Sequence, residues 1–141
     1  MEYRLAGNND LFLLAELNQQ LIRDEGHPNP MSVAELENRM RAWLVRSYSA
    51  VLFMTRGTVV AYALYRGDHA GIFLRQFFVC RDARRKGYGR AAVTLLLERI
   101  WPAGATVTLE ALVGNRTAIA FWRAVGFDDY AVTLRRRVPN A

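Results

Sequence analysis

The chain has 141 residues, of which 52% are hydrophobic and 23% charged, and its formal net charge is +6 at pH 7. This length and apolar content predict one packed globular domain over residues 1–141 and exclude a disordered chain. No apolar run is long enough to cross a bilayer, no leader pattern opens the sequence, and the single Cys80 allows no internal disulfide. We therefore expect a cytoplasmic protein without membrane contact.

The first half of the chain combines strand and helix patterns. Leucines at helical spacing follow the polar cluster at residues 8–10 and predict a helix that runs to about Asp24. Gly26 and two prolines end it, and the capping box that opens at Ser32 begins a second helix. The predicted strands of this half are residues 2–5, 49–55 and 58–66, of which the last two form a hairpin.

The second half continues the alternation. A strand over residues 72–80 is followed by a glycine-rich turn, and an amphipathic helix then begins after Gly89 and stops at Pro102. Asn115 should cap a further helix that ends at Gly126. The predicted strands of this half are residues 72–80, 106–113 and 132–138.

This order of elements predicts an α/β (α+β) fold. Its sheet should be mixed and mostly antiparallel, with six to seven strands flanked by four helices. A last strand at the sheet edge could pair with a second copy, so a homodimer is possible.

The turn between residues 80 and 90 has the composition of a phosphate-binding site. A buried strand ends in a basic segment, two glycines follow, and a helix begins. Glycines allow the backbone to approach a phosphate, the first turn of a helix presents N–H groups to it, and cations add charge. Backbone N–H groups from about Arg85 to Arg90 can converge on such a ligand. The turn residues concerned are Arg84, Arg85, Lys86, Gly87, Tyr88, Gly89 and Arg90.

Two other phosphate-binding motifs fit less well. Residues 87–92 match the dinucleotide pattern G-x-G-x-x-A, but six residues separate Gly87 from the strand, and the acid Glu110 falls inside the next predicted strand. A P-loop is excluded because the sequence has no Lys-Ser or Lys-Thr pair.

Arg84-x-x-Gly87-x-Gly89 resembles the acyl-CoA signature of the GNAT superfamily of N-acetyltransferases. Residues 109–115, LEALVGN, look like the next strand and asparagine of that family, and residues 118–127, AIAFWRAVGF, look like its A-x-x-F-[YW]-x-x-x-G-F helix. Three motifs in order are more specific than one. The resemblance implies the GNAT fold, acetyl-CoA as acyl donor, no metal, and direct acetyl transfer to a primary amine of a small molecule, amino acid or peptide.

The resemblance also implies roles for individual residues. A backbone N–H at Phe78 or Val79 would polarise the thioester carbonyl, as in an oxyanion hole. The turn from Arg84 to Arg90 would hold the pyrophosphate, with Arg84 itself in a structural position. Asn115 would cap its helix or bond the pantetheine. Many members carry a tyrosine where this chain has Trp122, whose indole does not usefully donate a proton. Trp122 is thus expected to wall the pantetheine or to pack in the core.

The general base and the acceptor contacts are less defined. Glu110 lies in an otherwise apolar strand, where burial would raise the pKa of its carboxyl and suit it to proton transfer; a salt bridge to Arg75 or simple exposure is the alternative. His27 titrates in a suitable range, although the sequence favours a loop histidine bonded to backbone or water. The segment between the first two helices should contact the acceptor through Glu25, His27 and Asn29, and Asp24 there would suit a cationic amine.

The sequence also allows two other functions. The missing tyrosine allows a non-catalytic CoA-binding or regulatory module of the same fold. The net charge allows a nucleic-acid-binding domain, but aromatic residues are not interleaved with the basic runs of the sequence, and this argues against it.

Overall fold

The computed structural model describes residues 1–26 and 28–141. The chain forms two compact units, Met1–Glu110 and Ala111–Ala141, which are described separately. The single domain expected over the whole chain stays a prediction.

The first unit is built on one sheet. Its strands are β1 (Glu2–Leu5), β2 (Tyr48–Thr55), β3 (Thr58–Gly67), β4 (Gly71–Val79) and β5 (Thr106–Leu109). Its helices are α1 (Leu11–Asp24), α2 (Val33–Arg46) and α3 (Tyr88–Leu95), and α3 continues as the π-helical segment η3 (Leu96–Ile100). Short 3-10 turns, η1 (Asn8–Asp10) and η2 (Arg81–Ala83), precede α1 and α3.

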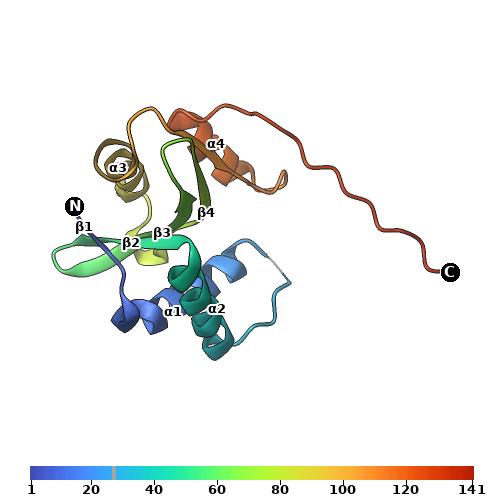
Figure 1. Ribbon diagram of the computed structural model, residues 1–141, viewed down its shortest axis with the longest axis horizontal. Coiled ribbons are helices and arrows are strands. Elements are labelled where there is room, and N and C mark those ends of the chain that lie inside the picture. Colours follow the sequence, from blue (N-terminus) through green and yellow to red (C-terminus); the bar gives the residue numbers. More distant parts are fainter. Residues whose placement is uncertain (27) are drawn as a thin grey trace. The chain divides into compact units, whose positions relative to one another are not determined.

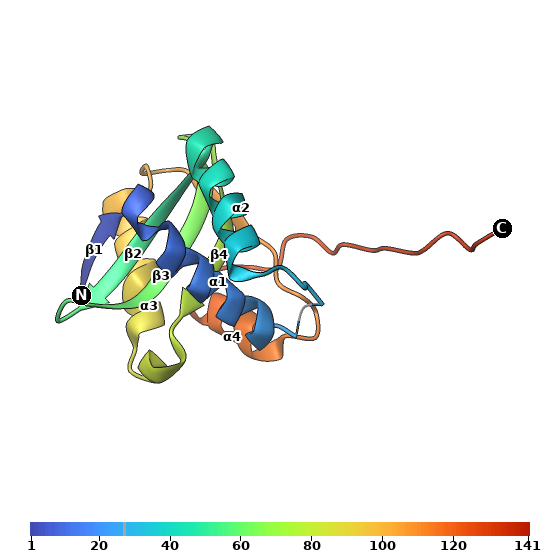
Figure 2. The same ribbon diagram turned by 90° about the horizontal axis from the view of Figure 1, so that it is seen from below.

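The five strands follow the chain order β1-β2-β3-β4-β5. Neighbours pair antiparallel except for β4 and β5, which are parallel. Figures 1 and 2 show α1 and α2 together on one face of this sheet and α3 on the opposite face. The mixed, mostly antiparallel sheet is the one the sequence predicts.

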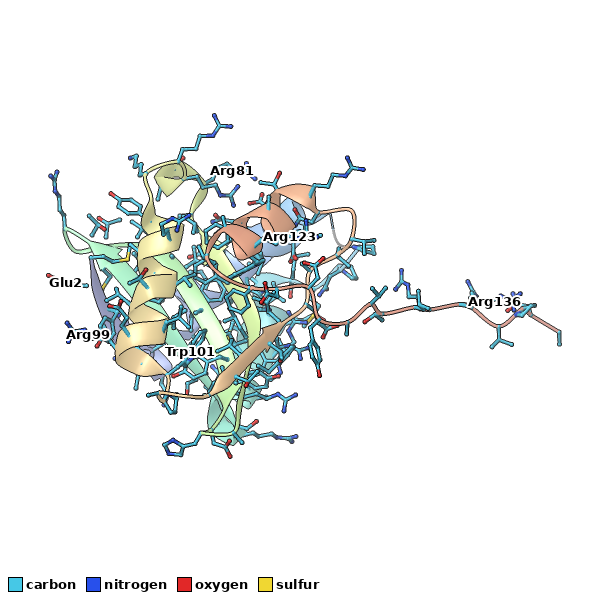
Figure 3. The ribbon with its side chains drawn as sticks, turned by 90° about the horizontal axis from the view of Figure 1, so that it is seen from above. Glu2, Arg81, Arg99, Trp101, Arg123 and Arg136 are labelled. Atoms are coloured by element: carbon cyan, nitrogen blue, oxygen red, sulfur yellow. The ribbon has the colours of Figure 1, made fainter. Side chains whose placement is uncertain are left out.

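Each face of the sheet buries the apolar stripe of its helices. On the α1/α2 face, Leu14 and Met40 are fully buried against Leu52 and Tyr62 of the sheet. On the α3 face, Leu96 is buried, and the indole of Trp101, labelled in Figure 3, meets another ring. The partner is Tyr65, whose ring it contacts edge-on at a centroid distance of 5.6 Å. Burial of leucine-sized side chains stabilises the fold by about 1.5–3 kcal/mol each.

Strand β4 contains a bulge that positions the site. Leu64 is paired with Gln76, but the next residue of β3, Tyr65, is paired with Leu74, so Arg75 has no residue opposite it. A bulge bends a strand and redirects its side chains. The ladder from β4 to β5 covers only Gly71–Leu74 and therefore stops where the bulge begins.

The second unit contains α4 (Arg116–Ala124). Asn115 caps this helix, since its Oδ1 accepts a hydrogen bond from the Ala118 N–H at 3.2 Å, as the sequence predicts. The indole of Trp122 packs edge-on against the rings of Phe121 and Phe127, with distances between ring centroids of 4.9 and 5.3 Å.

Two strand predictions need correction. The strand expected over residues 106–113 ends at Leu109, and residues 132–138 form no strand in the part of the chain that is described. The sheet therefore has five strands instead of six or seven. The side chains of Val132, Leu134 and Val138 have the alternating spacing of a strand but are 73–88% exposed. The edge through which we expected two copies to pair is thus absent.

Among the described residues, no helix is both long and apolar enough to span a bilayer.

Candidate functional site

The turn between β4 and α3 has backbone angles that favour glycine. Gly87, the N-cap of α3, has φ +79°, and Arg85 also lies in the left-handed region at φ +63°. A Cβ added at Gly87 would meet no protein atom within 4 Å. The glycine is therefore favoured by the backbone angle, and it leaves open space at the start of the helix.

The same turn concentrates positive charge. The first N–H groups of α3, at Tyr88, Gly89 and Arg90, have no acceptor within the helix and carry the positive end of its dipole. Arg85 and Lys86 are exposed beside them. In proteins generally, N–H groups at a helix start together with nearby cations favour the binding of anions such as a pyrophosphate.

Arg84 braces the turn. Its Nε donates to the Val79 carbonyl at 2.9 Å, and its guanidinium lies 5.3 Å from the centroid of the buried Phe78 ring. It also forms an ion pair with Asp24, the last residue of α1, which pairs with Arg81 as well. Arg84 thus has a structural role, and it links the end of β4 to the end of α1.

The ion pairs with Arg81 and Arg84 favour the ionised form of Asp24. Its side chain is only 17% exposed, and this burial alone would raise its pKa, but hydrogen bonds and charges from Arg84 and Arg81 hold the pKa below its ordinary value. A carboxylate at a helix C-terminus opposes the helix dipole, so the two arginines also offset that cost. Both carboxylate oxygens of Asp24 are bonded to Arg81 and Arg84, which argues against the expected contact of Asp24 with a cationic amine.

The end of β4 presents one backbone N–H to an open edge. The Cys80 N–H donates to the Val60 carbonyl of β3 at 2.8 Å. Successive residues of a strand point their N–H groups to opposite sides, so the Val79 N–H faces away from β3 and the Phe78 N–H faces it. The Val79 carbonyl, which accepts from Arg84, points to that same outer side. No strand of the described chain pairs with β4 there, because the β5 ladder stops at Leu74.

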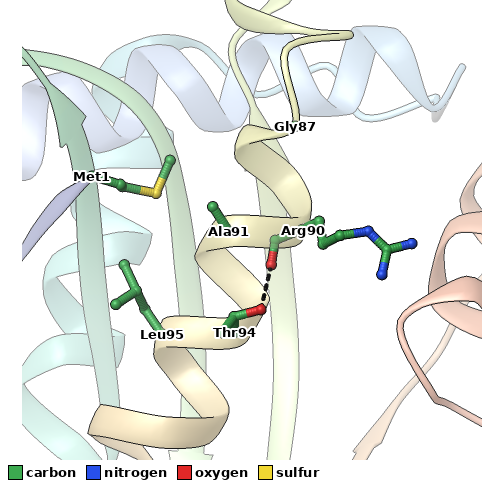
Figure 4. Close-up of a pocket in the computed structure, with 6 residues that line it drawn as sticks. All are labelled: Met1, Gly87, Arg90, Ala91, Thr94 and Leu95. Carbon is green, nitrogen blue, oxygen red and sulfur yellow. Dashed lines mark hydrogen bonds between the residues drawn. The ribbon is translucent and has the colours of Figure 1, made fainter.

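Two shallow cavities flank the turn. One, of about 460 Å³, runs along α3 from Gly87 to Leu95 with Met1 as its opposite wall (Figure 4). The other, of about 520 Å³, is lined by the hairpin residues around Arg56 together with Cys80, Lys86 and Tyr88.

The thiol of Cys80 is half-buried, and this burial raises its pKa. Its Sγ lies 3.7 Å from the Val59 carbonyl. A protonated, hydrogen-bonded thiol is a poor nucleophile, in keeping with direct transfer.

The predicted acceptor residues are only partly described. His27 lies outside the described residues. Glu25 is exposed at the C-terminus of α1, and Asn29 uses its Oδ1 to accept from the Met31 N–H at 2.9 Å, which forms a local turn. Both follow Asp24 closely in the chain, and the ion pair of Asp24 with Arg84 connects the end of α1 to the turn.

Glu110 differs from the expectation. It follows the last residue of β5 instead of lying inside a strand, and it is exposed. The burial on which its choice as a general base depended is therefore absent. Its position at a strand end also removes one of our arguments against a dinucleotide site.

Asn115 and Trp122 belong to the second unit. Asn115 uses its Oδ1 as a cap of α4. Trp122 packs among aromatic rings of its own unit.

Sequence reasoning missed the role of Asp24 and the bulge at Arg75. A charged residue at the unfavourable end of a helix is the signal that could have suggested an ion-pair partner for Asp24. Within the described residues, no group of three or more His, Cys, Asp or Glu side chains is placed to hold a metal ion.

Comparison with known proteins identifies the family of the chain. The family model described as the acetyltransferase (GNAT) family matches residues 10–127. No curated protein sequence matches the chain.

Solved structures share the fold at low sequence identity. A putative acetyltransferase from Agrobacterium tumefaciens is 23% identical with a TM-score of 0.77, and the match covers 98% of this chain and 100% of that one. An aminoglycoside N-acetyltransferase solved with CoA is 15% identical with a TM-score of 0.78, covering 97% and 93%. A predicted acetyltransferase from Clostridium acetobutylicum, solved with acetyl-CoA, is 18% identical with a TM-score of 0.71, covering 96% and 95%.

Proposed function

Because the chain belongs to the GNAT family of acetyltransferases, we propose that it transfers the acetyl group of acetyl-CoA directly to a primary amine of a small molecule, an amino acid or a peptide. The observation that carries this proposal is the left-handed Gly87 turn, which opens α3 beside the uncovered end of β4. Structures of similar fold solved with CoA and with acetyl-CoA support the choice of donor.

The turn would hold the pyrophosphate of the donor. The N–H groups of Tyr88, Gly89 and Arg90 would bond its oxygens, and Arg85 and Lys86 would add charge. Arg84 would act indirectly, because its guanidinium is already bonded to Val79 and Asp24. Asn115 and Trp122 stay proposed contacts of the pantetheine.

The Val79 N–H would polarise the thioester carbonyl. The amine nitrogen attacks the carbonyl carbon, negative charge develops on the carbonyl oxygen, and an N–H aimed at that oxygen lowers the barrier. The C–S bond then breaks, the CoA sulfur leaves as a thiolate, and the new amide nitrogen loses a proton. Of Phe78 and Val79, Val79 is the better candidate because its N–H faces away from the β3 ladder.

Glu110 and His27 stay the candidates for the base that takes this proton. Glu25, His27 and Asn29 stay the candidates for acceptor contacts. Because Glu110 is exposed, a water molecule would carry the proton from the amine to its carboxylate.

Two measurements test the proposal. Calorimetry with acetyl-CoA should detect binding, and its absence at millimolar donor would refute the assignment. A panel of primary amines, assayed by thiol release from acetyl-CoA, should show turnover. Binding of acetyl-CoA without turnover on any amine would instead favour the non-catalytic CoA-binding module.

A further inference from the structure

Three arginines and three aromatic residues alternate on the α1/α2 face of the sheet. They come from four elements that lie far apart in sequence. We name them the arginine–aromatic cluster: Arg39 and Trp43 of α2, Tyr48 of β2, Arg66 of β3, and Phe73 and Arg75 of β4.

Aromatic rings hold the three guanidinium groups of the cluster. The Cζ atoms of Arg39 and Arg75 lie 4.6 and 4.7 Å from the centroid of the Trp43 ring. Arg66 lies 5.3 Å from the centroid of Phe73. Contacts of this kind fix a guanidinium through the ring face and leave its N–H groups free to bond.

The Tyr48 hydroxyl completes the cluster. It accepts from Arg66 Nε at 3.1 Å and from Arg75 Nη1 at 3.3 Å. The remaining arginine, Arg39, donates from Nη2 to the buried Asn18 at 3.0 Å. A guanidinium has five N–H donors, so most donors of the cluster are not used by these bonds.

The charges of the cluster lack a counterion among the described residues of their own unit. Within residues 1–26 and 28–110, no carboxylate oxygen lies within 4.0 Å of the guanidinium groups of Arg39, Arg66 or Arg75. The contrast is with Arg4, Arg41, Arg81, Arg84 and Arg123, which all pair with a carboxylate. The described Arg39 Nε is moreover buried without a hydrogen-bond partner.

Electrostatics makes this arrangement costly without an anion. Partial burial and the charge of Arg75 lower the pKa of Arg39, which means that its charged form is disfavoured where it stands. Like charges held together attract a counterion, and bound anions are favoured where several donors converge.

The cluster lies on the same strand as the proposed transfer site. Val79 is four positions beyond Arg75 on β4. At about 3.3 Å per residue, the two are separated by about 13 Å along the strand. An extended peptide of three to four residues spans about this distance.

We propose that the arginine–aromatic cluster binds a carboxylate of the acceptor, and that the acceptor is a short peptide whose amine reaches Val79 while its C-terminal carboxylate contacts Arg39 and Arg75. This inference rests on the proposed acetyl transfer. It disfavours polycationic acceptors, because three unpaired arginines repel them.

A matched pair of acceptors tests the proposal. The peptide Ala-Gly-Gly-Gly is assayed with a free C-terminal carboxylate and as its C-terminal amide, with acetyl-CoA as donor. Charge-assisted hydrogen bonds predict a KM about 10- to 100-fold lower for the carboxylate form. Arg39→Gln and Arg75→Gln should each reduce this ratio toward one. Arg75 is exposed, so its variant is the safer one for folding.

The control is Arg99→Gln. Arg99 is an exposed arginine of η3 on the opposite side of the sheet, and its substitution makes the same change in charge (Figure 3). The preference for the carboxylate should persist in this variant. Loss of the preference in Arg99→Gln as well would attribute the effect to net charge and overturn the assignment to the cluster.

Calorimetry separates this inference from the function on which it rests. Both peptides are titrated into the protein in the presence of CoA. If no amine is turned over, the proposed activity fails, but a tighter affinity for the carboxylate form that Arg75→Gln abolishes still supports the cluster. Equal affinities for the two peptides refute it even if the enzyme is active.

Single-stranded oligonucleotide is the competing occupant, since arginines interleaved with aromatic rings also suit bases and phosphates. A deoxythymidine 12-mer is titrated into wild type and Arg75→Gln at low salt. Binding of the oligonucleotide that depends on Arg75, together with equal affinities for both peptides, would identify the cluster as a nucleic-acid surface and overturn the proposal. Oligonucleotide binding that does not depend on Arg75, together with tighter binding of the carboxylate peptide that does, supports the carboxylate assignment.

Discussion

The variant Gly87→Ala tests whether Gly87 is needed for the backbone angle of the turn, for the binding of acetyl-CoA, or for both. Gly87 has φ +79°, and an added Cβ there meets no protein atom within 4 Å. An L-residue in the left-handed region costs about 1–2 kcal/mol, so the free energy of unfolding should fall by this amount and no more. The methyl group would also point into the space that the phosphate is proposed to occupy.

The expected loss of affinity follows from the bonds at risk. If the methyl group prevents one backbone N–H from reaching a phosphate oxygen, about 1.5–3 kcal/mol of binding free energy is lost. The Kd for acetyl-CoA should then rise about 10- to 100-fold. Calorimetry measures this Kd, and urea unfolding measures the stability.

Gly104→Ala is the matched control. Gly104 has φ +85° and also has open space around its Cβ position, but it lies in the loop after η3, at the other end of this helix from Gly87. Both variants should lose similar stability, and only Gly87→Ala should lose affinity for acetyl-CoA. Equal affinities in the two folded variants would refute the phosphate site at this turn.

Other predictions concern ionisable groups and a helix cap. Asp24→Asn should lower the free energy of unfolding by about 1 kcal/mol near pH 7, since the arginine partners are partly exposed. Burial alone would raise the Asp24 pKa, but Arg84 and Arg81 lower it overall, so its stabilising effect is present above the unfolded-state pKa and is lost as the pH falls through the folded-state pKa. Urea titrations of the two proteins should therefore converge below about pH 4, and a constant gap would contradict this. Burial raises the pKa of the Cys80 thiol, so iodoacetamide should alkylate it more slowly at neutral pH than it alkylates glutathione; an equal rate would be inconsistent with the half-buried site. Ser32→Ala should lose about 1 kcal/mol in urea unfolding by removing the cap of α2, whereas an unchanged midpoint would show that the cap contributes nothing.

Local patterns in the sequence predicted most elements of the fold. The capping box at Ser32 and the cap at Asn115 both form as expected, because each depends on residues within one helical turn. The strand predicted at residues 132–138 was wrong for the opposite reason. Alternation of apolar residues is a local property, whereas a strand also needs a neighbour to pair with, and the sequence does not show whether one is present.

The site was predictable where it is contiguous. The turn from Arg84 to Arg90 is one segment, so its glycines, cations and helix start could be recognised together. The Asp24–Arg84 ion pair joins residues that are 60 positions apart, and the arginine–aromatic cluster draws on four elements. The sequence showed no interleaving of basic and aromatic residues in its basic runs, yet folding interleaves them elsewhere.

The bulge at Arg75 connects these two parts of the molecule. In a regular strand Arg75 and Gln76 would point to opposite faces. Here Arg75 contacts Trp43 and Gln76 accepts a hydrogen bond from the Tyr62 hydroxyl at 2.9 Å, so both lie on the α1/α2 face. The extra residue therefore adds a cation to the cluster without displacing the partly buried hydrogen bond between Gln76 and Tyr62. Because the β5 ladder also stops at Leu74, the same short segment of β4 leaves the edge at Val79 uncovered. One inserted residue thus links the open edge proposed for the thioester to the cations proposed for the acceptor.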